Sequence, residues 1–156
     1  MELDFLDKQV ECAIDKQSLF DLVEHVLKTL EIKTDEVAIH FVSKERIKDL
    51  HAIYFNDPTE TDCISFPIDE SETVGYDVLG DVFVCPAVAF EFAEAHNIDP
   101  LEEISRYVVH GLLHLIGYED SGEKAKEMEV IQEKMVQSLK AKGKLVRQKH
   151  RGEGSS

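Results

Sequence analysis

The sequence has no apolar run long enough to span a membrane, and residues 1–4 lack the basic start of a signal peptide. We therefore expect a cytoplasmic location and no membrane partner. The cysteines are scattered along the chain at Cys12, Cys63 and Cys85. They form no Cys-x-x-Cys pair, and their number is odd. This pattern argues against a zinc–thiolate cluster or a disulfide framework and predicts buried, reduced thiols.

Basic residues are scarce, with 17 Lys and Arg against 32 Asp and Glu, a formal net charge of −15. Six of them lie in residues 140–151, which contain no acid, so the remainder has 11 basic and 32 acidic residues, a net charge of −21. Such an acidic body repels nucleic acid at long range. The basic segment could bind RNA, although a solvated, frayed chain end explains it more simply. Its basic residues are Lys140, Lys142, Lys144, Arg147, Lys149 and Arg151.

Length and composition indicate a single domain, because 156 residues with 43% hydrophobic content can bury a real core and no repeat or linker interrupts them. We assign residues 1–140 to this domain and residues 141–156 to a basic, flexible tail. Apolar alternation predicts four strands and helical apolar spacing predicts five helices, an α+β fold. The strands are expected at 2–10, 37–42, 62–66 and 78–84, and the helices at 16–30, after Ser43, and at 86–96, 100–116 and 122–139.

Two histidines, His110 and His114, stand four residues apart in an apolar helical stretch. Positions i and i+4 share one helix face, so both imidazoles can point at one metal ion. A histidine pair on a helix usually binds nothing. Here, however, the flanks are apolar, and two buried imidazoles need polar partners, which one metal ion supplies to both. The pattern therefore favours metal ligation at the carboxyl end of this helix, where the helix dipole favours a cation.

Asp120 follows the turn expected at Gly117, where the chain can fold a carboxylate back over the helix end. Two histidines and a carboxylate with an open position form the ligand set of a catalytic zinc site, so we expect one Zn²⁺ ion, with other divalent metals still possible. Asp120 could instead cap the next helix, because Glu123 follows three residues later. Glu119 is the nearest rival ligand.

Three polar residues on or beside the predicted strands are weak candidates for the wall of the site that binds substrate. They are Asp62, Ser65 and Asp81. Asp81 lies in the middle of an apolar strand and fits the polar face of that strand slightly better. No residue can be assigned as the general base, so the catalytic residues stay unknown.

The stretch His110-Gly-Leu-Leu-His114-Leu-Ile-Gly-Tyr118 resembles the signature of the YbeY family, metal-dependent endoribonucleases of bacterial ribosomal RNA maturation. That signature reads His-Gly-x-Leu-His-Leu-x-Gly-Tyr-Asp-His. Residues 54–67 resemble the family's Tyr-Arg-x-x-Asp-x-Pro-Thr-Asp-Val-Leu-Ser-Phe-Pro segment, and residues 79–82 resemble its Leu-Gly-Asp-Ile strand. The resemblance covers most of the chain and implies a mixed sheet of about four strands with helices packed over it.

Three departures from the family pattern bear on the site. Asp120 stands where the family has its third histidine ligand, and aspartate is also an acceptable zinc ligand. Phe55 replaces the family's arginine, which removes an implied phosphate contact. Glu60 replaces a proline and adds negative charge near the expected path of RNA.

The resemblance implies a zinc-dependent endoribonuclease that acts in ribosomal RNA maturation, with RNA as partner and ribosomal or assembly proteins as further partners. The first alternative is a non-catalytic ribosome-assembly factor with a structural metal, which Phe55 and the acidity favour somewhat. A zinc metallopeptidase ranks below both. Such enzymes carry a glutamate base after the first histidine, where this chain has Gly111.

Overall fold

A computed structural model, which describes residues 1–55, 63–68 and 75–149, contains one sheet of four strands. The strands are β1 (Glu2–Lys8), β2 (Glu36–Val42), β3 (Cys63–Pro67) and β4 (Val78–Val84), in the order β1-β2-β4-β3. β1, β2 and β4 run parallel, and β3 runs antiparallel to β4 at one edge of the sheet. The expected mixed sheet is therefore confirmed.

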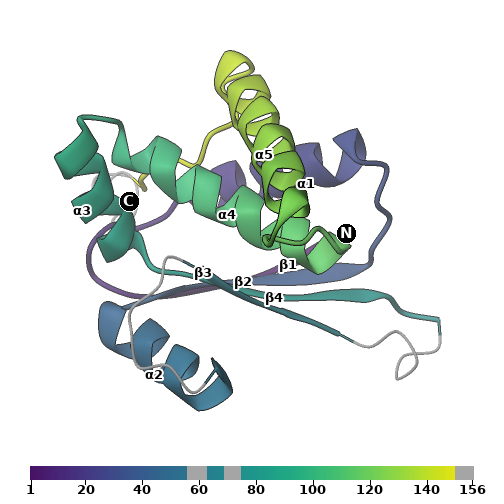
Figure 1. Cartoon of the computed structure of the whole chain (residues 1–156), viewed down its shortest axis with the longest axis horizontal. Coiled ribbons are helices and arrows are strands. Elements are labelled where there is room, and N and C mark those ends of the chain that lie inside the picture. Colours follow the sequence, from purple (N-terminus) through teal and green to yellow (C-terminus); the bar gives the residue numbers. More distant parts are fainter. Residues whose placement is uncertain (56–62, 69–74, 150–156) are drawn as a thin grey trace, which may run out of the picture.

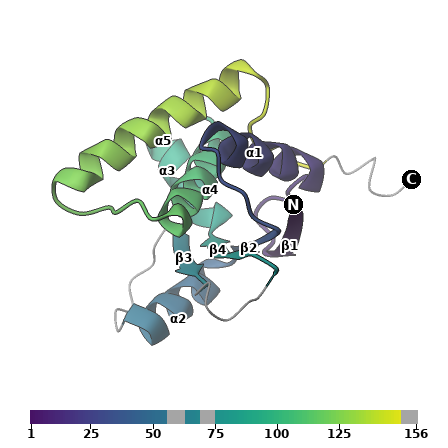
Figure 2. The same cartoon turned by 90° about the vertical axis from the view of Figure 1, so that its right-hand side faces the viewer.

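Five helices occur in the described residues and cover the sheet unequally (Figures 1 and 2). They are α1 (Lys16–Thr29), α2 (Lys44–Phe55), α3 (Pro86–His96), α4 (Pro100–Ile116) and α5 (Glu123–Ala141). α2 lies alone on one face, and the other four lie on the opposite face. α4 packs against β3 and β4, and α5 crosses α4 on the side away from the sheet (Figure 2). The α+β class and the number of elements agree with the sequence-based expectation.

Local signals set both ends of α4. The Asp99 carboxylate caps the first turn by accepting a hydrogen bond from the backbone N–H of Leu101 at 2.9 Å, and Pro100 opens the helix. Gly117 ends it in the left-handed conformation, with φ of 115°, which glycine adopts without steric cost. The start and the end predicted for this helix are confirmed, and they place His110 and His114 on its last two turns.

α4 approaches the sheet most closely at Gly111. A Cβ atom at this position would overlap Cγ1 of Val82 on β4, and it would lie 3.2 Å from the Ser65 hydroxyl on β3. That hydroxyl donates a hydrogen bond of 2.9 Å to the Gly111 carbonyl oxygen. Gly111 therefore faces the sheet, while the neighbouring His110 contacts α5 through Gln132.

The described part of the basic C-terminal segment, residues 141–149, packs on the body of the protein. Val146 is 1% exposed, and its backbone N–H donates to the Ser105 hydroxyl at 2.9 Å. The N–H of Arg147 donates to the Ser18 hydroxyl at 2.8 Å. This segment thus joins α4 to α1, and a buried valine anchors it.

We expect Val146→Ala to lower the free energy of unfolding by about 2 kcal/mol, because it removes two buried methyl groups and leaves a cavity. Urea denaturation measures this loss. Val130→Ala, at a position that is 53% exposed, is the matched control and should change stability by less than about 0.5 kcal/mol. Equal effects of the two substitutions would show that the segment does not dock in solution.

Cys12 and Cys85 are buried, and Cys63 is partly exposed. The predicted burial is confirmed for two of the three cysteines. Burial raises the pKa of the Cys12 thiol above its ordinary value. Within the described residues, no helix is both long and apolar enough to cross a membrane.

Candidate metal centre

The imidazoles of His110 and His114 meet at their Nε2 atoms, which lie 3.1 Å apart. His110 Nδ1 lies 2.7 Å from Gln132 Oε1, and His114 Nδ1 lies 3.2 Å from the backbone carbonyl oxygen of Tyr118. Both partners are oxygen acceptors, so a neutral ring at either position donates its proton from Nδ1 and turns the lone pair of Nε2 towards the other ring. In that form the two Nε2 atoms present lone pairs to each other, and a cation bound by both would stabilise the arrangement.

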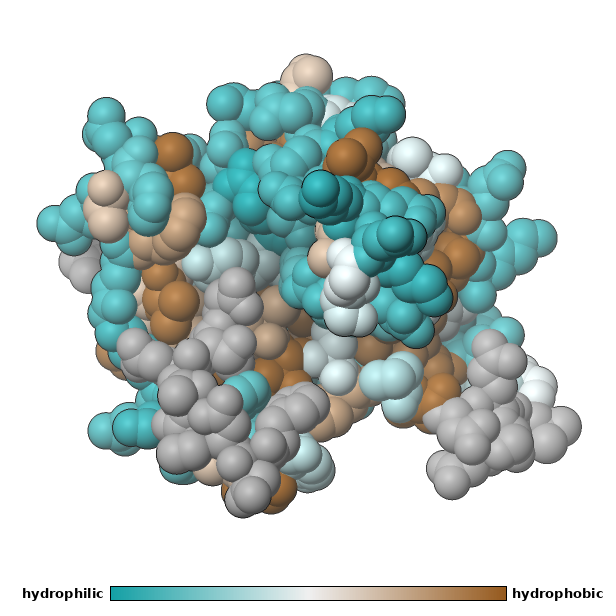
Figure 3. Space-filling model, viewed as in Figure 1, coloured by the Kyte–Doolittle hydropathy of each residue, from teal (hydrophilic) through white to brown (hydrophobic). Residues whose placement is uncertain are grey.

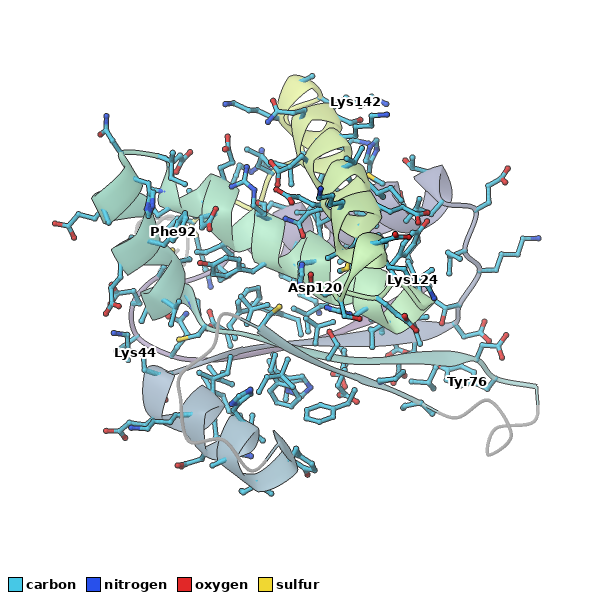
Figure 4. The ribbon with its side chains drawn as sticks, in the orientation of Figure 1. Lys44, Tyr76, Phe92, Asp120, Lys124 and Lys142 are labelled. Atoms are coloured by element: carbon cyan, nitrogen blue, oxygen red, sulfur yellow. The ribbon has the colours of Figure 1, made fainter. Side chains whose placement is uncertain are left out.

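Asp120 brings a carboxylate to the same point. Its Oδ2 lies 3.5 Å from His110 Nε2, and ligand atoms of His110, His114 and Asp120 all lie within 4.8 Å of one another. The side chain of Asp120 is 52% exposed, so this side of the cluster is open to solvent. Figure 4 shows Asp120 where α4 and α5 cross. Two imidazole nitrogens and one carboxylate oxygen fit a divalent metal with an open coordination position.

The geometry of the turn bears on two alternatives, Asp120 as the cap of α5 and Glu119 as a rival ligand. The N-cap residue of α5 is Gly122, and no side chain caps that helix start by a hydrogen bond, so Asp120 does not serve as the cap. The carboxylate of Glu119 pairs with Lys124 at 3.2 Å and is 60% exposed. Asp120, and not Glu119, is therefore the carboxylate that joins the histidines.

A groove of about 290 Å³ runs beside this cluster between α4 and α5. Its lining consists of Arg106, His110, Asp120, Ala125, Met128, Glu129, Gln132 and Glu133. In the space-filling view the surface of α5 is mostly hydrophilic (Figure 3). A polar groove that opens beside the candidate ligands suits a polar substrate better than an apolar one.

The family described as "Endoribonuclease YbeY" matches residues 4–140 of this chain. The chain belongs to the YbeY family. The endoribonuclease YbeY of Protochlamydia amoebophila is 46% identical over 114 residues, covering 73% of this chain and 76% of the relative. That of Chlamydia trachomatis serovar D is 40% identical over 124 residues, covering 78% and 77%.

The fold has a solved counterpart. The solution structure of TM1509 from Thermotoga maritima superposes with a TM-score of 0.62 and 27% sequence identity, covering 90% of this chain and 91% of that one. The two proteins therefore share the mixed sheet and the helices packed on it. Membership of the YbeY family makes this chain one of a family of endoribonucleases.

Of the three residues proposed for the substrate wall, the structure describes Ser65 and Asp81, and both make contacts elsewhere than with the candidate ligands. Ser65 uses its hydroxyl to bind the Gly111 carbonyl oxygen, beneath α4. Asp81 alternates with Val82 along β4 and so points to the opposite face of the sheet, where its Oδ1 lies 2.9 Å from His40 Nε2. Asp62 lies outside the described residues, as do Glu60 and Arg151.

The sequence pattern did not identify Gln132 as a residue that contacts the candidate ligand His110. Gln132 lies on α5 between Met128 and Met135, which are 1% and 4% exposed, on the helix face that packs inward. A polar residue within that apolar stripe was the available signal. Its partner, His110, lies 22 residues earlier, and the helical pattern of α5 alone does not reveal which residue Gln132 meets.

Proposed function

We propose that this chain is a zinc-dependent endoribonuclease that acts on ribosomal RNA or its precursors in the cytoplasm, with His110, His114 and Asp120 holding one zinc ion. The observation that supports it most is the pair of Nε2 atoms 3.1 Å apart with a half-exposed carboxylate beside them. The relatives are endoribonucleases by name, which supports RNA as the substrate.

A zinc ion in this centre would polarise a phosphoryl oxygen and lower the pKa of a water molecule towards neutrality. The residues of the chain would orient the site. Tyr118 and Gln132 hold the two imidazoles by their Nδ1 atoms, and Asp120 leaves one side open to the groove. The guanidinium of Arg106, which also lines the groove, is already paired with Glu133 at 2.8 Å.

Metal removal and reloading test the proposal. Chelator-stripped protein should fail to cleave single-stranded RNA, and stoichiometric Zn²⁺ should restore cleavage, with Mn²⁺, Co²⁺ and Fe²⁺ compared in parallel because a carboxylate ligand also suits harder metals. Elemental mass spectrometry of the purified protein identifies the bound metal. Metal-loaded, folded protein that leaves RNA intact would overturn the enzymatic proposal.

The second candidate is a ribosome-assembly factor in which the metal is structural. The acidic body and Phe55, at the family's arginine position, favour it. Titration of one RNA at several salt concentrations, beside a turnover assay, separates the two candidates. Tight, salt-sensitive binding without turnover would identify the assembly factor, which would engage ribosomal or assembly proteins as well as RNA.

Asp120→His would restore the family's third ligand, and we expect it to retain or tighten zinc binding because imidazole is a favourable zinc ligand. Competition with a chromogenic chelator gives the dissociation constant. Glu119→His is the matched control, because Glu119 pairs with Lys124 away from the centre, and it should change nothing. A strong loss of affinity in folded Asp120→His protein would mean that the turn accommodates only the shorter carboxylate.

We expect the exposed basic residues of the C-terminal segment to supply phosphate contacts if the protein binds RNA without a partner. Truncation would also remove the buried Val146, so Lys142→Gln, Arg147→Gln and Lys149→Gln together form the cleaner test.

Removal of each phosphate contact should flatten the log–log salt dependence of binding to single-stranded RNA by about 0.7, with metal content unchanged. Lys126→Gln with Lys134→Gln, exposed on α5, is the control for net charge. Matching salt curves for the triple variant and the unsubstituted protein would eliminate the segment as an RNA-binding element.

A further inference from the structure

Gln132 connects α5 to the metal centre on α4. Its Oε1 lies 2.7 Å from Nδ1 of His110, closer than the 3.2 Å between His114 Nδ1 and its backbone acceptor. Met128 and Met135, buried on the same face of α5, direct the Gln132 side chain towards α4. The hydrogen bond is thus built into the packing of two helices.

Glu133 decides which end of the Gln132 amide faces His110. The amide nitrogen of Gln132 donates to Glu133 Oε2 at 3.2 Å. A carboxylate only accepts hydrogen bonds, so the NH₂ group must face Glu133 and the carbonyl oxygen must face His110. With the opposite orientation, an oxygen would face the carboxylate and an NH₂ group would face the imidazole.

Arg106 holds Glu133 in place from α4. Its Nε and Nη2 atoms lie 2.8 and 3.1 Å from the two carboxylate oxygens of Glu133, a two-point pair of fixed geometry. Arg106 is itself restrained, since its side chain is 18% exposed and also donates to Glu103 and Glu102. A hydrogen bond from Lys140 holds the pKa of the Glu102 carboxyl below its ordinary value.

We propose that Gln132, oriented by Glu133 and Arg106, is the positioning residue that fixes His110 in its Nδ1–H form and directs its Nε2 lone pair at the metal. This inference rests on the proposed metal function of the site. Partners that hold the outer nitrogen of a ligating histidine typically change metal affinity by about 10–100-fold. α5 therefore sets the metal affinity of a centre whose ligands come from α4 and the following turn.

Two variants of Gln132 separate positioning from packing. Gln132→Met keeps the length of the side chain but removes the acceptor, and Gln132→Glu keeps an acceptor. Gln137→Met, exposed on the same helix, is the matched control. Chelator competition gives the zinc dissociation constant. Two-bond ¹H–¹⁵N correlations of histidine-labelled, metal-free protein show which ring nitrogen of His110 carries the proton, with His110→Ala as the assignment control.

We expect Gln132→Met to weaken zinc binding by about 10–100-fold and to convert His110 to a mixture of Nδ1–H and Nε2–H forms. Gln132→Glu should restore the Nδ1–H form, because it again offers His110 an acceptor, but only part of the affinity, because its second oxygen faces the Glu133 carboxylate. Gln137→Met should match the unsubstituted protein. If Gln132→Met does not fold, Glu133→Gln, which keeps Gln132 but removes the group that orients it, should show the same mixture with a smaller loss of affinity.

Unchanged zinc affinity and an unchanged His110 signature in folded Gln132→Met would overturn the inference. Failure of the proposed metal function gives a different result, because the unsubstituted protein itself would then bind no zinc. The spectrum of metal-free protein decides the role of Gln132 in that case too, since the Nδ1–H form requires no metal.

Discussion

Replacing His110 with alanine is expected to abolish zinc binding and RNA cleavage while leaving the protein folded. The substitution removes one of two nitrogen donors and leaves His114 with a half-exposed carboxylate. Removing only the partner of a ligand's outer nitrogen costs up to about 100-fold in metal affinity, so removing a ligand should cost more than that. Because His110 is a polar side chain that is 23% exposed, the cost in stability should be smaller than that of truncating a fully buried leucine.

Zinc affinity, RNA cleavage and urea denaturation should be measured together on His110→Ala and two comparison variants. His96→Ala, exposed on α3, should behave as the unsubstituted protein. Leu112→Ala, at a fully buried position on the same helix, should reduce stability by about 2–5 kcal/mol but retain zinc. A His110→Ala protein that fails to fold would indicate a structural metal, and one that binds zinc normally would contradict the ligand assignment.

Gly111→Ala is expected to destabilise the protein, although the same change in an exposed helix stabilises it. Alanine gains about 1 kcal/mol of helix propensity over glycine. Its Cβ would overlap Cγ1 of Val82, and such overpacking costs about 1–3 kcal/mol. The net loss of stability should therefore be up to about 2 kcal/mol, measured by urea denaturation.

Val82→Ala supplies the control, because it removes the atom that the new Cβ would meet. In the Val82→Ala background, Gly111→Ala should become neutral or stabilising, so the two substitutions should be strongly non-additive. Additive effects would mean that α4 does not approach β4 closely at this point.

Gly111→Glu, which would match the zinc-peptidase pattern, should unfold the protein without conferring peptidase activity, because position 111 points at the sheet and cannot reach the metal centre.

Some parts of this protein follow from local signals. Asp99, Pro100 and Gly117 mark the ends of α4 because capping and left-handed turns depend on residues only a few positions apart. The shared face of His110 and His114 follows from the helical repeat alone. The strands are recognisable for the same reason, since alternation is a local pattern.

Other features could be stated only as alternatives. Whether Asp120 caps α5 or turns to the histidines depends on how the loop folds over α4, and the same residue types serve both outcomes. The face of the sheet on which the Asp81 side chain lies follows only from how β4 packs against α4. A strand has two faces, and its sequence does not say which of them the site occupies.

The sequence by itself therefore determined the elements, the ends of α4 and the pair of histidines on one helix face. Tertiary structure alone decided that Gln132 meets His110 and that the basic segment around Val146 packs against α1 and α4. These interactions join residues 22 to 129 positions apart in the chain. Propensity and periodicity act within a few turns, whereas the partner of a side chain on another element depends on how whole helices pack, which is set by the combined burial of many apolar residues.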